Sequence, residues 1–85
     1  GPRTVIYGAG AGGVMVLREA RSNGELGWKV IGFIDDDRGK FRTSVHGVPV
    51  LGSLEQVAPL LTSGQVAQVI VSTSTVAPER LDALT

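Results

Sequence analysis

The stretch TVIYGAGAGG, residues 4–13, constrains the fold of this chain more than any other feature. The β-branched run over residues 3–7 predicts a strand that stops at Gly8. Only glycine and alanine follow up to Gly13, and helical spacing then begins at Val14. A segment so poor in side chains adds little to a core. Its backbone is therefore expected to lie against another part of the fold or against a ligand.

Three of these glycines fit the pattern G-x-G-x-x-G between a strand and a helix. Gly8 permits a tight turn out of the strand, where a positive φ would strain other residues. Gly10 lets a pyrophosphate approach the backbone, and Gly13 lets the helix pack closely on the strand. The first turn of the helix offers unpaired N–H groups to an anion. Gly12 also allows the shorter spacing G-x-G-x-G.

Two further elements follow in the first half of the chain. Apolar residues at helical spacing over residues 14–21 predict a helix, which Ser22-Asn23-Gly24 ends. Residues 29–34 are almost continuously apolar, a pattern typical of a central parallel strand that is covered on both faces.

The second half predicts shorter elements. Residues 48–50 form at most a short edge-type strand, because Pro49 cannot donate to a ladder. Ser53 and Gln56 form a capping box for a helix, in which Pro59 is expected to cause a kink or a break. Residues 68–71 predict a strand, and residues 78–81 the first turn of a third helix.

Alternation of strands and helices predicts an α/β fold: a Rossmann-like open parallel sheet with helices on both faces. We expect residues 3–85 to form one partial domain, cut off at its C-terminal end, because 85 residues cannot supply every strand of a complete dinucleotide fold. Residues 1–2, Gly-Pro, are interpreted as a scar left by removal of an affinity tag.

Asp35 follows Gly13 by 22 residues and closes the second strand, where an acidic side chain accepts hydrogen bonds from ribose hydroxyls. Its charge would repel a 2′-phosphate, which favours NAD over NADP. Asp36 and Asp37 could extend the ribose contact or hold a divalent ion, although a solvated loop at the strand end is the favoured interpretation. The basic side chains at 38, 40 and 42 could meet a 2′-phosphate or the phosphates of a nucleotide sugar. The predicted cofactor-binding residues are Gly8, Ala9, Gly10, Ala11, Gly12, Gly13, Asp35, Asp36, Ser72 and Thr73.

Ser72 and Thr73 follow the last predicted strand. Hydroxyls at the carboxyl ends of parallel strands can bind a cofactor, and they can equally serve a turn.

The amino-acid composition argues against several classes of function. Eight basic and eight acidic side chains give zero net charge, and aromatics make up 5%, which argues against nucleic acid and against a charged membrane surface. There is no cysteine and no apolar run of the roughly 18 residues that a membrane span needs. The lone His46 is interpreted as a surface residue, and no metal site is predicted. No nucleophile–base set or pair of carboxylates indicates a catalytic centre within these residues.

The segments TVIYGAGAGG, ELGWKVIGFIDDD, HGVPVLGSLEQV and QVIVSTSTVAPERL resemble the N-terminal CoA-binding-like Rossmann domain of bacterial polysaccharide-biosynthesis proteins. In that family the domain precedes a nucleoside-diphosphate-sugar 4,6-dehydratase (epimerase-like) module, and similar domains accompany membrane sugar-1-phosphate transferases. The resemblance covers nearly the whole chain. It implies a cytoplasmic regulatory or cofactor-binding module, on Gly8, Gly10, Gly13 and Asp35. The catalytic Tyr-x-x-x-Lys pair would belong to another domain of a larger parent enzyme, for which the resemblance implies an association with the inner membrane.

Three functional hypotheses follow. The first is a module that binds NAD(H) through the glycine loop and Asp35. The second is a sensor of CoA or a nucleotide sugar, such as a UDP-sugar, through the same loop. The third is a ligand-free interaction domain that holds a homodimer together, through apolar surface around Trp28 or through an open sheet edge.

Overall fold

The computed structural model describes residues 1–72, so the helix predicted over residues 78–81 lies outside the described residues. The elements in chain order are β1 (Arg3–Tyr7), α1 (Ala11–Ser22), β2 (Lys29–Ile34), the 3-10 helix η1 (Arg38–Lys40), β3 (Ser44–Val45), β4 (Val48–Gly52), α2 (Leu54–Thr62) and β5 (Gln68–Val71).

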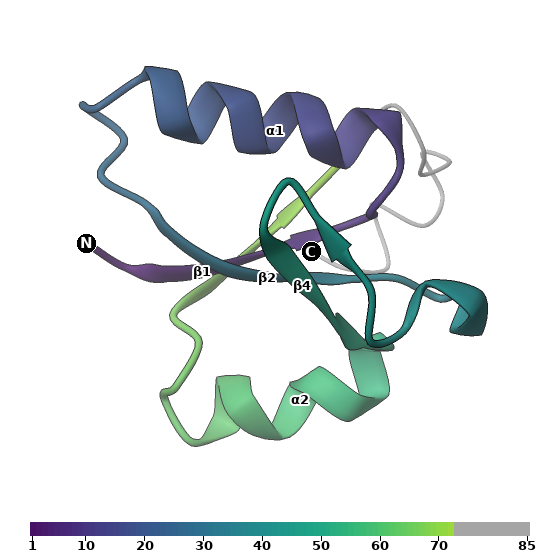
Figure 1. Cartoon of the computed structure of the whole chain (residues 1–85). Helices are drawn as coiled ribbons and strands as arrows, with labels where there is room; N and C mark the ends of the chain where they lie inside the picture. The colour runs from purple at the N-terminus through teal and green to yellow at the C-terminus, as the bar shows by residue number, and fades with distance from the viewer. Residues whose placement is uncertain (73–85) are drawn as a thin grey trace.

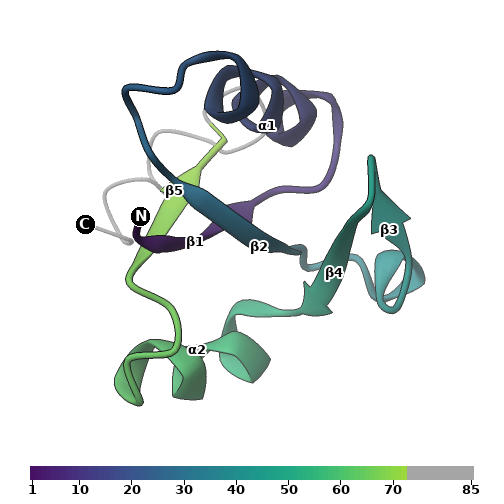
Figure 2. The ribbon, with the colours of Figure 1, turned by 60° about the vertical axis from the view of Figure 1, so that its left-hand side comes forward.

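The five strands form one sheet in the order β3-β4-β2-β1-β5 (Figure 2). Every pairing is parallel except that of β3 with β4. Helix α1 covers one face of the sheet and α2 covers the other (Figure 1). The predicted α/β, Rossmann-like class is confirmed. Because the main strands are parallel, the carboxyl ends of β1, β2, β4 and β5 meet at one edge.

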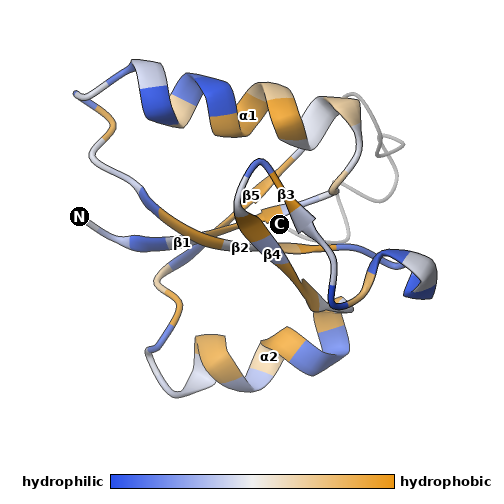
Figure 3. Cartoon of the chain, in the orientation of Figure 1, coloured by the Kyte–Doolittle hydropathy of each residue, from blue (hydrophilic) through white to orange (hydrophobic). Residues whose placement is uncertain are grey.

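The core consists of two apolar clusters, one on each face of the sheet. Alternate side chains of β1 supply both: Ile6 packs with Leu17 and Phe33 on the α1 face, and Val5 with Val57 on the α2 face. Figure 3 shows apolar residues along the central strands between the two helices. The unbroken apolar run of β2 follows from this arrangement, because both of its faces are covered.

The expectation of a short edge strand at residues 48–50 is wrong. β4 has five residues and lies between β2 and β3. Its paired residues with β2 are Val50 and Gly52, so Pro49 lies before the first paired residue of that ladder. Pro49 itself is exposed and lies opposite Ser44 of β3.

Ser53 begins α2 with the predicted capping box, which Gln56 completes. Of the kink or break expected at Pro59, the break does not occur, because α2 is one helix from Leu54 to Thr62. Pro59 leaves only the carbonyl of Glu55 without its intrahelical partner, and this exposed first turn can be hydrated. Within residues 1–72, no helix combines the length and the hydropathy needed to cross a membrane.

Candidate functional site: a glycine loop tied to Asp35

The loop from β1 to α1 has two of the geometries that the glycine pattern predicts. Gly8 has a φ of 110°, and its N–H donates to the carbonyl of Ile34 at 2.7 Å. A Cβ on Gly13 would overlap the carbonyl oxygen of Gly8 and stand 3.2 Å from Cε1 of Phe33. Both positions therefore require glycine for the fold itself, because one needs positive φ and the other allows the helix to touch the strand.

Gly10 differs from these two glycines, because the fold does not require it. It is the N-cap of α1 with an extended backbone, φ −86°, that any residue can adopt. A Cβ there would meet only Nζ of Lys40, at 3.9 Å. The space beside Gly10 is thus open, with an ammonium group at its side.

The start of α1 presents backbone donors at this open space. The first helical bond runs from the N–H of Val14 to the carbonyl of Gly10, at 3.0 Å. The N–H groups of Ala11, Gly12 and Gly13 precede it and have no acceptor within the helix. No side chain caps this end, and the first turn has no acidic residue. Donors, a helix dipole and Lys40 together favour an anion here.

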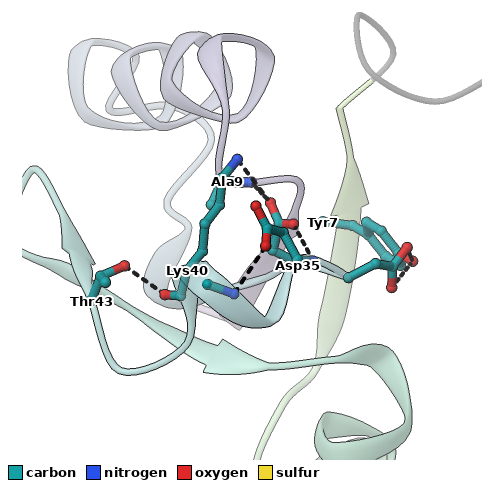
Figure 4. Close-up of polar contacts among 8 residues, drawn as sticks. Tyr7, Ala9, Asp35, Lys40 and Thr43 are labelled. Carbon is teal, nitrogen blue, oxygen red and sulfur yellow. Dashed lines mark hydrogen bonds and ion pairs between the residues drawn. The ribbon is translucent and has the colours of Figure 1, made fainter.

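Asp35 lies beside the loop, immediately after β2 (Figure 4). Its Oδ2 accepts from the N–H of Ala9 at 2.9 Å, and its Oδ1 accepts from the N–H of Asp37 at 2.8 Å. Nζ of Lys40 lies 3.6 Å from Oδ2, and the Asp35 side chain is 14% exposed. Burial raises the pKa of Asp35, but the two hydrogen bonds and Lys40 together outweigh it and hold that pKa below its ordinary value. Asp35 is therefore an anion at neutral pH.

Asp36 contacts Tyr7, which belongs to the apolar cluster on the α2 face of the sheet. The hydroxyl of Tyr7 donates to its carboxylate, 2.7 Å from Oδ2. These two side chains line a pocket of about 480 Å³ on the α2 side of the sheet edge. The other lining residues are Arg38, Phe41, Ser53, Leu54, Glu55 and Gln56. Sequence reasoning missed this pocket, although strand alternation does place Tyr7 on the face opposite Ile6.

The structure thus brings together the loop at residues 8–13 and Asp35, and it separates Asp36 from them. Ala9 and Gly12 are buried within the loop and the first turn of α1. Ser72 is buried beside the end of β1, where its N–H donates to the carbonyl of Tyr7 at 3.1 Å. Thr73 lies outside the described residues. Sequence reasoning named Lys40 only as one of three basic side chains, and the structure places it beside Gly10.

Across residues 1–72, no three side chains of the kinds that bind metals converge. Trp28 is partly buried before β2.

Comparison with known protein families supports the resemblance seen in the sequence. A family model described as a CoA-binding domain matches residues 1–85. "Probable polysaccharide biosynthesis protein EpsC" of Bacillus subtilis (strain 168) is 30% identical over 82 residues, which is 96% of this chain and 14% of that protein. Capsular polysaccharide biosynthesis protein CapD of Staphylococcus aureus is 26% identical over 80 residues, covering 93% of this chain and 13% of that protein. The chain therefore spans only a small part of either relative.

A solved structure has the same fold. The crystal structure of UDP-D-quinovosamine 4-dehydrogenase from Vibrio fischeri superposes with a TM-score of 0.76 at 24% sequence identity. The match covers 98% of this chain and 69% of that one. At this level of identity the likeness concerns the fold.

Proposed function

The chain belongs to the family of CoA-binding domains, and from that premise we propose that it is a nucleotide-binding module whose favoured ligand is NAD(H). The diphosphate of the ligand lies on the glycine loop. One observation carries this proposal: the space beside Gly10 is open, faces the uncapped start of α1 and is flanked by the ammonium of Lys40. An alanine or serine would fit the fold at position 10. We therefore infer that the absence of a side chain at Gly10 leaves room for the diphosphate of a ligand.

Asp35 favours NAD(H) among the nucleotides with a diphosphate. Each carboxylate oxygen has two acceptor sites, and the N–H of Asp37 uses one site of Oδ1. The other can accept from a ribose hydroxyl, whereas the negative charge repels a 2′-phosphate. CoA and UDP-sugars carry the same diphosphate and are the alternative ligands.

The pocket beside Tyr7 and Asp36 offers room for another part of the ligand. It opens at the same edge of the sheet as the glycine loop, across the end of β2. Its aromatic and polar lining suits a planar group with hydrogen-bonding edges.

We further propose that this module serves a larger polysaccharide-biosynthesis enzyme, in which another domain carries the chemistry. The similarity to EpsC and CapD, confined to a small part of each, supports this arrangement.

Isothermal titration with NAD+ tests the proposed function. We expect the wild-type chain to bind NAD+ with micromolar affinity and Gly10→Val to bind none, because the valine side chain fills the space of the diphosphate. Circular dichroism should show the same fold in both proteins, since a Cβ at this position meets no backbone. Absence of heat with the folded wild type overturns NAD(H), and titrations with CoA and a UDP-sugar then decide between the alternatives.

A further inference from the structure

We infer that Asp35 is a positioning residue, which shapes the diphosphate site by holding the glycine loop and Lys40 in place. This inference rests on the proposed function and deepens it. The role is distinct from that of a ribose acceptor, because it acts on a part of the ligand that Asp35 need not touch.

A hydrogen bond from Ala9 ties the glycine loop to Asp35. Ala9 lies between Gly8 and Gly10, and it is 7% exposed. Its N–H donates to Oδ2 of a residue 26 positions later, at the end of the neighbouring strand. Without the carboxylate this buried N–H would lose its acceptor, and the loop would have to change shape to reach water. The bond therefore fixes the loop at the residue next to Gly10.

Both carboxylate oxygens of Asp35 have partners within the protein. Oδ2 binds the N–H of Ala9 and lies near Lys40, while Oδ1 binds the N–H of Asp37, at the start of the turn that carries Lys40. Asparagine has the same shape but only one acceptor oxygen. Its NH₂ group would face one of the two backbone donors. Asp35→Asn must therefore lose one of these bonds as well as the ion pair.

Loss of the Asp35 charge changes anion affinity in a direction that depends on the role of Asp35. Asp35 carries the same charge as a diphosphate, so Coulomb's law alone predicts that its neutralisation tightens anion binding. A ribose acceptor predicts no loss for an anion without a ribose. A positioning residue predicts weaker binding of that anion. Inorganic pyrophosphate has no ribose. Its binding to the Asp35 variants therefore distinguishes simple charge repulsion, a ribose acceptor and a positioning residue.

The experiment measures pyrophosphate and NAD+ binding to the wild-type chain, Asp35→Asn and Asp35→Ala. Glu25→Gln is the matched control, because it removes an exposed negative charge from the turn that precedes β2, at the opposite edge of the sheet. We expect Asp35→Asn and Asp35→Ala each to weaken pyrophosphate binding by about tenfold or more, the usual effect of losing a hydrogen bond to a charged group. Glu25→Gln should bind as the wild type does. Unchanged or tighter pyrophosphate binding in the Asp35 variants overturns the inference.

Amide hydrogen exchange supplies a second measurement that needs no ligand. Asp35→Ala should accelerate exchange at Ala9 by about tenfold more than at Ile6, a buried strand residue that reports global opening. An equal change at both amides overturns the inference. If the wild type binds neither NAD+ nor pyrophosphate, the proposed function fails, and the exchange at Ala9 still decides whether Asp35 holds the loop.

Discussion

The carbonyl oxygen of Gly8 occupies the place where a Cβ on Gly13 would stand, so β1 and α1 meet as bare backbone. This contact sets the start of α1 against the end of β1. It explains why the donors of the first helical turn lie at the sheet edge where Asp35 and Lys40 also lie.

Gly13→Ala should therefore destabilise the fold. The added methyl group meets backbone, which cannot rotate away, so α1 must shift from the sheet. We expect the free energy of unfolding to fall by about 1–3 kcal/mol, as for overpacked cores, in urea denaturation followed by circular dichroism. Gly24→Ala is the control, because a Cβ there meets nothing within 4 Å. Equal stability of the two variants would contradict this contact.

Gly10→Ser should separate stability from binding. A serine at an N-cap can accept from the first turn, so α1 should gain a few tenths of a kcal/mol, about the usual difference from glycine. The same side chain narrows the space for the diphosphate, and NAD+ affinity should fall. Thermal unfolding and calorimetric titration of one preparation check both effects. A variant that binds NAD+ as tightly as the wild type would speak against the proposed site.

Lys40→Gln should weaken NAD+ binding by roughly tenfold, since the ligand loses one charged donor at the diphosphate. The salt dependence of binding should also decrease. Lys29→Gln serves as the control, because Lys29 is exposed at the start of β2, at the other edge of the sheet. Titrations at two salt concentrations measure both effects. Equal losses in the two variants would indicate a general charge effect.

Asp35 should make stability depend on pH in acid. Its pKa is lowered in the folded protein, so its contribution is complete above the ordinary value of 3.8 and is lost as the pH falls through the folded-state pKa. The wild type should be more stable than Asp35→Asn at neutral pH, and the difference should shrink below about pH 4. Urea denaturation at several pH values measures it. A difference that grows on acidification would contradict this sign.

Local pattern was enough to predict much of the fold. β1, β2 and β5 have the predicted bounds, because β-branched and continuous apolar runs specify buried parallel strands. The break expected at Pro59 does not occur, because the carbonyl that Pro59 leaves without a partner belongs to Glu55, in the exposed first turn of α2. The length of β4 was missed because Pro49 lies before the residues of β4 that pair with β2.

The site was only partly predictable, because its key contacts join distant residues. The glycine pattern indicates the loop, and the spacing indicates Asp35. No local signal shows that Asp35 binds Ala9, since that bond depends on how β1 and β2 lie side by side. Lys40 reaches Gly10 through the turn of η1, which Asp37 caps by accepting from the N–H of Gly39.

Amide resonances followed by NMR during titration with NAD+ test the central claim most directly. We predict saturable shifts at Ala11, Gly12 and Gly13, which Gly10→Val abolishes, and no shift at Gly24 on the opposite edge of the sheet. Saturable binding that leaves the resonances of residues 11–13 unchanged would contradict the account, because the diphosphate would then lie elsewhere.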